Sequence, residues 1–426
     1  MSARWLALVE SNTTGTGRAF CSSAVELGLQ PVLLTRDPDR YPYLRPDGIA
    51  VRRVDTSDVT QVIAACSRLA GDGLLGVTSS SEYFVATAAR AARQLGLPAP
   101  DPEAVLRCRS KDVQRAALRS GGVPVPAFAP ADDVATAVAA AAAIGHPVVL
   151  KPASGSGSVG VRLCRTPAET RSWAAELLSR STDERGAPIQ ARILVEAAVA
   201  GPEFSVETDG GQVVAVVAKQ TGPEPWFVET GHDVPAPVPA ATAAALGDVA
   251  RRALVALGLG WGAAHTELRL TAAGPVVIEV NPRLAGGMIP VAIRAATGVD
   301  LVTAVVARTA GLPAPVAGPG AGSAAVRFVL GTHEGVVTAV DGLPAAAVAP
   351  GVVSATATTT PGRPFRVTHS FLDRIACVVA TGPDAATAAS FATSAADLVT
   401  LRVAGSRQPP PGPQRPPTPD RGVSAR

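Results

Sequence analysis

Two glutamates and an asparagine in one short stretch have the types and the spacing of a magnesium site. Two runs of alternating apolar and polar residues flank a Thr-Ala-Ala-Gly-Pro turn at residues 271–275, which predicts a β-hairpin. A turn centred on Ala273 sets Glu267 opposite Glu279, with Asn281 two residues further along the same face. Carboxylate and amide oxygens are the hard ligands that magnesium prefers, and such a site can also hold phosphate.

Two directly opposed carboxylates need an explanation, because like charges in that position are destabilising. At an effective dielectric constant of about 20, two carboxylates about 4 Å apart repel by roughly 4 kcal/mol. A bound divalent cation removes this repulsion, and an exposed hairpin whose acids face water avoids it. The spacing alone leaves both interpretations open. In either case we expect Leu268, Leu270, Ile278 and Val280 to face a core on the other side of the hairpin.

A lysine followed by a loop of glycine and serine is a second group that could do chemistry. Lys151 ends an apolar run and precedes Gly155-Ser-Gly157-Ser158-Val-Gly160. Glycines let the backbone approach an anion closely, and Lys151 can add a positive charge to the phosphate cradle that results. The loop lacks the Lys-Ser or Lys-Thr of a Walker A motif. A plain hairpin connection has the same composition and stays open as the alternative.

Acidic residues recur on one face of a later strand. Glu196 ends an apolar run, and Glu203, Ser205 and Glu207 then share one face because side chains alternate along a strand. Acids on one face indicate either the solvated side of a sheet or a polar binding surface.

The elements that position these residues follow an α/β pattern. A β-loop-α-β beginning, repeated more loosely, predicts a small parallel sheet over roughly the first hundred residues. We expect a helix at residues 111–120, a predominance of strands from residue 193 to the hairpin, and a mixture of strands with one helix at residues 324–403. The proline-rich end of the chain predicts a disordered tail.

Composition excludes several classes of protein. The 426 residues are 47% apolar and 17% charged, which indicates a globular protein of two or three domains. Four arginines and one aspartate at residues 406–426 account for the net charge of +3, so no basic surface for nucleic acid is implied. Five scattered cysteines without metal-type spacing predict reduced thiols in the cytoplasm, and no apolar run is long enough to span a membrane.

Taken together, the motifs resemble the ATP-grasp superfamily, and specifically its carboxylate–amine ligases of the L-amino-acid (dipeptide) ligase type. The resemblance covers about residues 1–405. The motifs that carry it are, in chain order, Ser110-Lys111-Asp112, Leu150-Lys151-Pro152 with its Gly/Ser loop, Val195-Glu196, Gly201-Pro-Glu203-Phe-Ser-Val-Glu207, Glu229-Thr-Gly-His232, His265-Thr-Glu267 and Glu279-Val-Asn281-Pro-Arg283-Leu-Ala-Gly286-Gly287.

The resemblance implies an α/β fold of the ATP-grasp type, in which two subdomains clamp ATP. It implies a Rossmann-like parallel-sheet domain at residues 1–107 and an ATP-grasp domain at residues 108–310. The second of these divides into a small lid subdomain at about residues 108–195 and a large subdomain at about residues 196–310. A C-terminal α+β domain at residues 311–405 and a disordered tail at residues 406–426 follow.

The resemblance also implies roles for the matched residues that face the nucleotide. These are the phosphate-binding lysines Lys111 and Lys151, the loop residues Gly157 and Ser158, the adenine hinge Glu196 with Ala198 or Val199, and the ribose acceptor Glu203. Glu267, Glu279 and Asn281 match the ligands of magnesium, for which manganese is the alternative, and this agrees with the opposed pair in the hairpin.

The remaining matched residues face the substrates, which the resemblance implies are small amino-acid-like carboxylates and amines. Arg283 matches the arginine that stabilises the transferred phosphoryl group, and Gly286 and Gly287 let a substrate approach the backbone. Glu229 and His232 fall where related ligases contact amino-acid substrates, and Glu82 falls where this subgroup places an acid near the active site.

The sequence defines the roles of three of the histidines less closely. His232 can deprotonate the incoming ammonium group, orient it, or simply pack in a loop, and the sequence does not choose among these. We expect His265 to orient Glu267 rather than to bind magnesium, which prefers oxygen. His146, before Pro147, is expected to be structural.

The reaction implied is activation of a carboxylate by ATP to an acyl-phosphate, followed by attack of an amine and release of ADP and phosphate. An intramolecular cyclo-ligase and a non-catalytic ATP-binding module are the alternatives. A carboxylase that uses bicarbonate is also conceivable, but the chain has no Met-Lys-Met motif for biotin attachment. Related ligases are often dimers, so a homodimer is compatible with the resemblance, and neither nucleic acid nor a membrane is implied as a partner.

Overall fold

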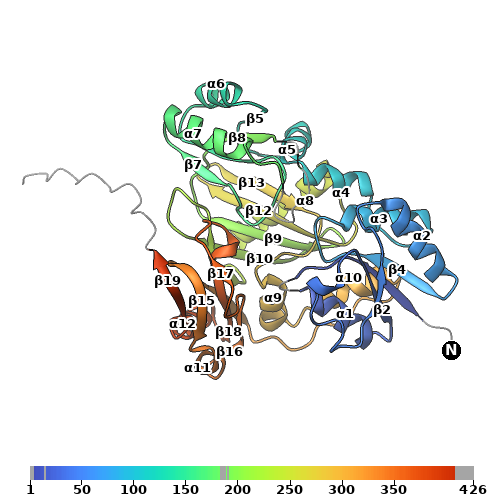
Figure 1. Cartoon of the computed structure of the whole chain (residues 1–426). Coiled ribbons are helices and arrows are strands. Elements are labelled where there is room, and N and C mark those ends of the chain that lie inside the picture. Colours follow the sequence, from blue (N-terminus) through green and yellow to red (C-terminus); the bar gives the residue numbers. More distant parts are fainter. Residues whose placement is uncertain (1–3, 14–15, 183–188, 190, 408–426) are drawn as a thin grey trace, which may run out of the picture.

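The structure is a computed structural model that describes residues 4–13, 16–182, 189 and 191–407 (Figure 1). Within these residues the strands form four sheets packed with α-helices, which confirms the α/β class expected from the sequence. The predicted tail lies outside the described residues, except that the last strand reaches Arg407.

The N-terminal region is a parallel sheet with strand order β3-β2-β1-β4. Its elements are β1 (Trp5–Val9), α1 (Gly17–Glu26), β2 (Gln30–Thr35), a 3₁₀ turn (Pro38–Arg40), β3 (Ala50–Arg53), α2 (Val59–Ala70), β4 (Leu74–Thr78) and α3 (Val85–Gln94). Leu6 and Leu8 pack into one apolar cluster while Ala7 and Val9 pack into another, so both faces of β1 are buried. Burial on both faces is usual for a parallel sheet, and the repeated β-loop-α-β prediction is confirmed.

Two short helices, α4 (Pro102–Arg109) and α5 (Lys111–Ser120), lead into a small antiparallel sheet with order β5-β8-β6-β7. Helix α5 begins at Lys111, as the sequence predicted. The small sheet and its two helices comprise β5 (Phe128–Ala131), α6 (Val134–Ile144), β6 (Val148–Pro152), β7 (Arg162–Cys164), α7 (Pro167–Leu178) and β8 (Ile193–Ala197). In Figure 1 this unit lies above the central sheet, and because β8 runs to Ala197, Glu196 belongs to it.

The largest sheet has eight strands in the order β13-β12-β9-β10-β11-β14-β18-β16. Its first five members are β9 (Glu203–Asp209), β10 (Gln212–Thr221), β11 (Glu229–Val234), β12 (Ala263–Thr271) and β13 (Gly274–Asn281). The other three come from the C-terminal part of the chain and are β14 (Ser323–Leu330), β16 (Val352–Ala357) and β18 (Arg374–Gly382). One continuous sheet therefore joins the central region to the C-terminal region.

A long helix precedes the hairpin where the sequence predicted a predominance of strands. Helix α8 (Ala240–Leu257) buries Leu246, Val249, Leu254 and Leu257 against the central sheet, and this spacing is that of one helical face. The prediction was wrong because the run is rich in alanine, so the few large apolar residues that define its period are easily overlooked.

Helices and a second small sheet complete the C-terminal part. They are α9 (Ile289–Thr297), α10 (Leu301–Thr309), β15 (Glu334–Asp341), α11 (Leu343–Ala347), β17 (Pro364–Phe365), a 3₁₀ turn (Phe371–Asp373), α12 (Ala385–Ala396) and β19 (Thr400–Arg407). Strands β17, β15 and β19 pair in that order. Within the described residues, no single helix has the length and apolarity to cross a membrane, and only the bent pair α9 and α10 meets these criteria when taken together.

Candidate active site

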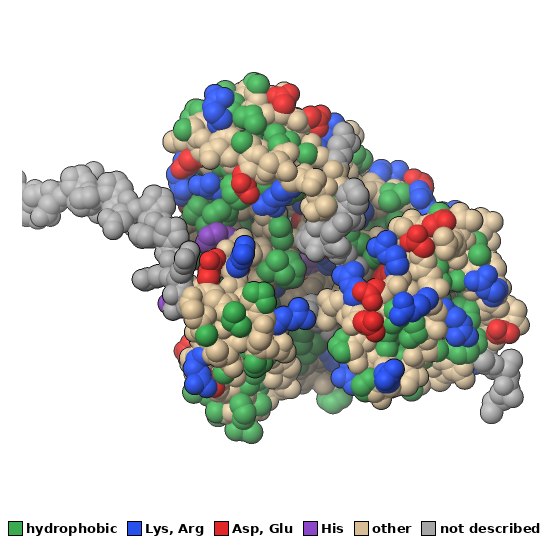
Figure 2. Space-filling view, viewed as in Figure 1, with side chains coloured by type: hydrophobic (Ala, Val, Ile, Leu, Met, Phe, Trp, Pro, Cys, Tyr) green, Lys and Arg blue, Asp and Glu red, His purple; other side chains and the backbone are tan. Residues whose placement is uncertain are grey.

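A cavity of about 1460 Å³ lies where the small sheet, the eight-stranded sheet, the N-terminal sheet and the C-terminal strands meet. Figure 2 shows the molecule hollowed between these parts. All of the residues predicted to bind nucleotide, metal or substrate line this cavity, with the exception of His232. Motifs that are separated by up to two hundred residues in sequence therefore share one space.

The hairpin of β12 and β13 pairs Glu267 with Glu279 and His265 with Asn281, as expected. The turn is tighter than predicted, because Thr271 already pairs with Gly274. A bulge after Glu267 then shifts the register by one residue, and this shift brings Glu267 opposite Glu279.

The bulge redirects Ile278, whose predicted place in the core is wrong. Ile278 lines the cavity, while Val277 takes a fully buried position beside Leu268 and Val280. The carbonyl of Ile278 accepts a hydrogen bond from the buried Arg115 guanidinium of α5. A bulge exposes a carbonyl that no longer pairs across the ladder, and here an arginine satisfies it.

Cationic side chains lie beside both of the opposed carboxylates. The Lys111 Nζ lies 3.1 Å from Glu279 Oε1, and it also donates to the Gly155 carbonyl at 2.7 Å. Glu267 accepts from Lys219 Nζ at 2.5 Å and from His265 Nε2 at 3.1 Å. The expected orienting role of His265 requires a contact of this kind with Glu267.

The charges of His265 and Glu267 support each other in a buried place. Burial opposes the charged form of His265, but Glu207, whose Oε1 lies 2.6 Å from Nδ1, and Glu267 raise the pKa of His265 to about 9. Burial opposes ionisation of Glu267, and Lys219 and His265 nevertheless hold its pKa well below the usual range. Both groups are therefore charged at neutral pH.

Glu267, Glu279 and Asn281 fit a magnesium ion by the chemistry of their donors. All three offer oxygen atoms, and all three line the cavity on the side of the hairpin that faces away from the apolar cluster around Leu268. Oxygen ligands next to a phosphate-sized loop are the usual surroundings of this ion.

Lys151 and Glu196 form a buried ion pair on neighbouring strands β6 and β8. Arg115 Nε lies 2.5 Å from Glu196 Oε1, so the carboxylate has two cationic partners. Burial opposes ionisation of Glu196, but Arg115 and Lys151 hold its pKa below the usual value.

The segment after β8 carries the predicted adenine hinge. The Ala198 N–H donates to the Pro147 carbonyl at 3.2 Å, and the Val199 carbonyl accepts from Arg269 Nη1 at 3.0 Å. Of the two predicted backbone donors, only the Val199 N–H has no hydrogen-bond partner in the part of the chain that the structure describes.

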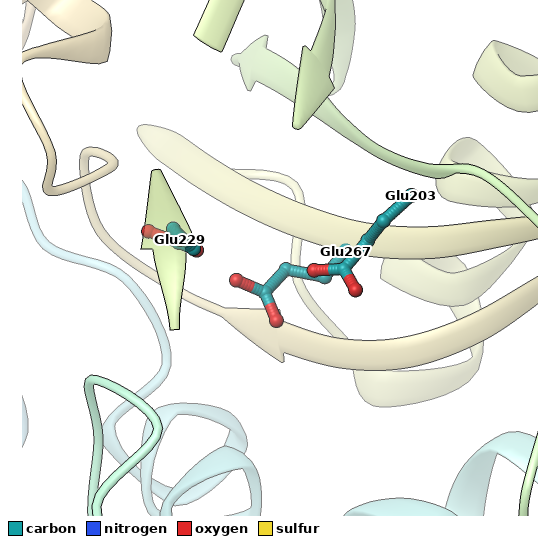
Figure 3. A group of neighbouring side chains, drawn as sticks. All are labelled: Glu203, Glu229 and Glu267. Carbon is teal, nitrogen blue, oxygen red and sulfur yellow. The ribbon is translucent and has the colours of Figure 1, made fainter. Parts of the chain in front are cut away.

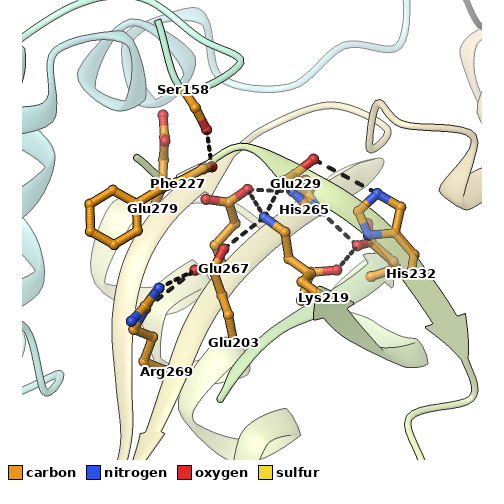
Figure 4. A network of polar contacts seen from close by, with 12 residues as sticks. Ser158, Glu203, Lys219, Phe227, Glu229, His232, His265, Glu267, Arg269 and Glu279 are labelled. Atoms are coloured by element: carbon orange, nitrogen blue, oxygen red, sulfur yellow. Dashed lines mark hydrogen bonds and ion pairs between the residues drawn. The ribbon is translucent and has the colours of Figure 1, made fainter. Parts of the chain in front are cut away.

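The glycine- and serine-rich loop packs against the C-terminal part of the chain. Gly157 has a φ of +65°, a left-handed conformation that glycine tolerates best, and a Cβ built there would lie 2.2 Å from the Phe371 ring. The Phe371 N–H donates to the Gly157 carbonyl at 3.1 Å, and Ser158 Oγ donates to the Phe227 carbonyl at 2.9 Å (Figure 4). This position requires glycine for reasons of both conformation and space.

Aromatic rings extend this contact between the small sheet and the C-terminal part. The Trp226 ring stacks on His369 with centroids 4.3 Å apart, and Trp173 meets Trp226 edge-on at 5.3 Å. The Trp173 indole donates to the Gly160 carbonyl at 3.1 Å. The loop is thus held from both of its ends.

Arg283 and Glu82 meet although they are two hundred residues apart. Arg283 Nε lies 3.1 Å from Glu82 Oε2, its Nη2 contacts the same oxygen, and Arg109 contacts the other carboxylate oxygen. Burial would raise the pKa of Glu82, but Arg283 and Arg109 lower it to about 2. The N-terminal sheet therefore supplies an acid that fixes the arginine beside the hairpin.

His232 lies beneath the cavity wall rather than in it. Its side chain is 1% exposed, neither ring nitrogen has a hydrogen-bond partner among the described residues, and Nε2 is 3.7 Å from Glu229 Oε2. A Cβ built at Gly287 would lie 2.7 Å from Nε2, and the Phe328 ring meets the imidazole edge-on. Burial lowers the pKa of His232 to about 3, so the imidazole is uncharged at neutral pH.

Sequence reasoning missed the cations that organise these acids, above all Lys219 on β10. Its Nζ lies 2.5 Å from Glu229, 2.5 Å from Glu267 and 3.1 Å from Glu203 (Figure 4). Arg374 of β18 also contacts Glu229, at 2.7 Å. A compositional signal was available: the chain has only three lysines against 35 arginines, and all three lysines line this cavity.

Three segments of the chain match models of known protein families. Residues 21–99 match the ATP-grasp N-terminal domain, residues 144–291 the ATP-grasp domain, and residues 327–404 the L-amino acid ligase C-terminal domain 2. The uncharacterized protein y4rH of Sinorhizobium fredii is 38% identical over 395 residues, which are 92% of this chain and 82% of that protein. The chain belongs to the ATP-grasp superfamily of enzymes. Within it, the chain belongs to the carboxylate–amine ligases of the L-amino acid ligase type.

Two further proteins are similar to the chain. Carnosine synthase 1 of Homo sapiens is 29% identical over 323 residues, which cover 70% of this chain but only 39% of that protein. The crystal structure of L-amino acid ligase from Bacillus licheniformis superposes with a TM-score of 0.79 at 20% identity, covering 95% of this chain and all of that one. The second similarity establishes the same fold over nearly the whole chain.

Proposed function

We propose that this chain joins two small amino-acid-like molecules through an amide bond, with ATP converted to ADP and phosphate and an acyl-phosphate as the intermediate. The observation that carries this proposal is the convergence of Lys111, Lys151, the Gly/Ser loop and the opposed pair Glu267 and Glu279 on one cavity that also contains Arg283. Amino-acid ligases among the relatives support the substrate class. We place the reaction in the cytoplasm, where ATP is available and the five buried free cysteines stay reduced.

We assign the nucleotide to the part of the cavity between the small sheet and the hairpin. Lys111 and Lys151 neutralise phosphate charge beneath Gly157 and Ser158, and the Val199 N–H is the hinge donor to adenine. The buried contacts of Glu196 with Lys151 and Arg115 support a role in holding the phosphate lysine, in addition to the predicted contact with adenine. Glu203 is the proposed partner of the ribose hydroxyls.

Glu267, Glu279 and Asn281 would hold magnesium, or manganese in its place, and the ion supplies further neutralisation of the phosphates. Lys111, 3.1 Å from Glu279, is positioned to bridge this carboxylate and a phosphate oxygen.

The carboxylate substrate attacks the γ-phosphorus of ATP, and the bond to the β,γ-bridging oxygen breaks as ADP leaves. Arg283, held in place by Glu82, offers a fixed guanidinium to the transferred phosphoryl group. The amine then attacks the acyl carbon, phosphate leaves, and one proton is lost from nitrogen. Closure of the Gly/Ser loop against Phe371 excludes water, which would hydrolyse the intermediate.

The test is incubation of the purified chain with ATP, MgCl₂ and pooled amino acids, followed by phosphate measurement and mass spectrometry. Ligation gives a product with the mass of two substrates minus water, and this result supports the proposal. A mass of one substrate minus water identifies a cyclo-ligase instead, and no ATP-dependent product from any pool contradicts amide formation between amino acids.

A further inference from the structure

Lys219 occupies the centre of a group of acids that come from three other strands of the eight-stranded sheet. On β10 it lies directly opposite Glu203 of β9, and Glu203 in turn lies opposite Arg269 of β12. Glu229 of β11 and Glu267 of β12 reach the same ammonium group from the two sides. The side chain of Lys219 is 1% exposed, so water cannot take over any of these contacts.

The three acids form a cluster that has the geometry of a cation site. One oxygen from each of Glu203, Glu229 and Glu267 lies within 4.8 Å of the other two (Figure 3). The Nζ of Lys219 contacts all three carboxylates, at 2.5 to 3.1 Å, so a covalently attached cation takes the central place. Each outer cation contacts one member of the cluster: Arg269 contacts Glu203, Arg374 contacts Glu229 and His265 contacts Glu267.

The three acids have three different assignments in the proposed function. Glu203 is assigned to the ribose, Glu267 to magnesium and Glu229 to the amino-acid substrate. No other side chain among the described residues forms ion pairs with all three of them.

We propose that Lys219 is a positioning residue that holds the ribose, metal and substrate acids of this ligase in one fixed arrangement, and that its ammonium group keeps this carboxylate cluster from binding a divalent cation itself. The assignments of the three acids rest on the proposed function. The displacement of metal by the ammonium group rests only on the geometry of the cluster.

Loss of the positive charge of Lys219 has a consequence that loss of a lysine with a purely structural role would not have. Lys219→Met keeps the length and apolar stem of the side chain but leaves three carboxylates close together in a buried place. Three such carboxylates without a cation at their centre form a site of hard oxygen ligands. We therefore expect the variant to acquire a divalent cation when no nucleotide is present.

The first experiment measures Mn²⁺ bound by the nucleotide-free protein, from the electron paramagnetic resonance signal of the free ion. We expect Lys219→Met to bind Mn²⁺ at least about tenfold more tightly than the wild-type chain. Arg269→Met is the matched control, because it removes one positive charge beside the same cluster but leaves the contacts of Lys219 in place. We expect this control to bind Mn²⁺ like the wild-type chain.

The second experiment measures melting temperatures and applies even if Lys219→Met folds poorly. The melting temperature of Lys219→Met should rise more on addition of MnCl₂ than that of the wild-type chain does. If repulsion among the acids prevents folding altogether, Lys219→Met combined with Glu229→Gln removes one of the three charges and should restore a folded protein. A double variant that stays unfolded contradicts the electrostatic role.

The third experiment separates positioning from the ligase assignment. In Lys219→Ala we expect kcat/KM for ATP to fall by about 100-fold, and ethylammonium in the buffer to recover part of that loss by returning a positive charge to the cavity. Normal kcat/KM in the variant, or Mn²⁺ binding equal to that of the wild-type chain, overturns the inference on Lys219 while the ligase assignment stands. Gain of Mn²⁺ binding in a chain with no ligase activity supports the role of the ammonium group and contradicts the proposed function alone.

Discussion

Replacement of Gly157 by alanine is the most direct test of how the loop closes over the nucleotide. Two effects oppose alanine at this position. A left-handed backbone costs an L-residue roughly 1–2 kcal/mol, and the φ of Gly157 is +65°. The added Cβ would also lie 2.2 Å from the Phe371 ring, whereas carbon atoms in contact are normally about 3.5–4.0 Å apart.

The added methyl group cannot be accommodated while the loop stays on Phe371. The closed position of the loop is therefore destabilised by at least the free-energy cost of the left-handed backbone. A loss of roughly 1–2 kcal/mol corresponds to an increase of about 5- to 30-fold in KM for ATP, and the steric clash adds to it. The assay is ADP release at varied ATP concentration, with the melting temperature measured on the same samples.

Two further variants isolate the two effects. Gly122→Ala is the matched control, because Gly122 has a φ of +69°, no heavy atom lies within 4 Å of a Cβ built there, and it does not line the cavity. It should lower the melting temperature and leave KM for ATP unchanged. Phe371→Ala in the Gly157→Ala background removes the clash and should bring KM back toward the conformational term alone.

A wild-type KM for ATP in Gly157→Ala would contradict the proposed closure of the loop against Phe371. A rise in KM in Gly122→Ala as large as that in Gly157→Ala would also contradict it, because the effect would then be one of general stability rather than of loop closure.

Three other outcomes are expected from the same geometry. Glu279→Ala should reduce ADP formation by at least about 100-fold at an unchanged melting temperature, and turnover that survives, measured beside the exposed-site control Glu176→Ala, would refute the metal assignment. The pKa of Glu82 is lowered from 4.5 to about 2, so its ion pairs stabilise the fold fully above about pH 4.5, and this stabilisation is lost as the pH falls toward 2. The difference in the free energy of unfolding between the wild-type chain and Glu82→Gln should therefore shrink between about pH 5 and pH 3. A difference that stays constant contradicts the pairing. Ile278→Ala should raise KM for ATP with little loss of stability, whereas the neighbouring change Val277→Ala should cost about 2–3 kcal/mol in the free energy of unfolding with KM unchanged, and equal losses in the two variants would mean that the bulge is misplaced.

The facing of Glu267 and Glu279 could be predicted because alternation along two strands and a short turn leave few registers. The position of Ile278 could not, since a bulge leaves no mark on the apolar pattern and depends here on Arg115, which is 163 residues away in sequence and donates to the bulged carbonyl.

The acids of the site were visible in the sequence, but their partners were not. Glu203, Glu229 and Glu267 stand in motifs, whereas Lys219 ends an apolar run that reads as an ordinary buried strand. Which cation reaches which acid is decided by the order of the strands, and β12, which follows β11 in the chain, lies beside β9 only in the folded sheet.

The pairing of β11 with β14 determines how the chain can be divided. Gly231 through Val234 exchange their ladder contacts with Ala324 through Arg327, and Arg327 adds an ion pair to Asp233 at 2.9 Å. A fragment ending near residue 311 would leave the outer side of β11 as an unpaired edge strand. Unpaired edge strands readily pair with strands of other molecules, which leads to aggregation. The C-terminal segment is therefore not an independent unit that can be removed. A chimaera that exchanges it with the segment of a relative must keep the pairing register with β11.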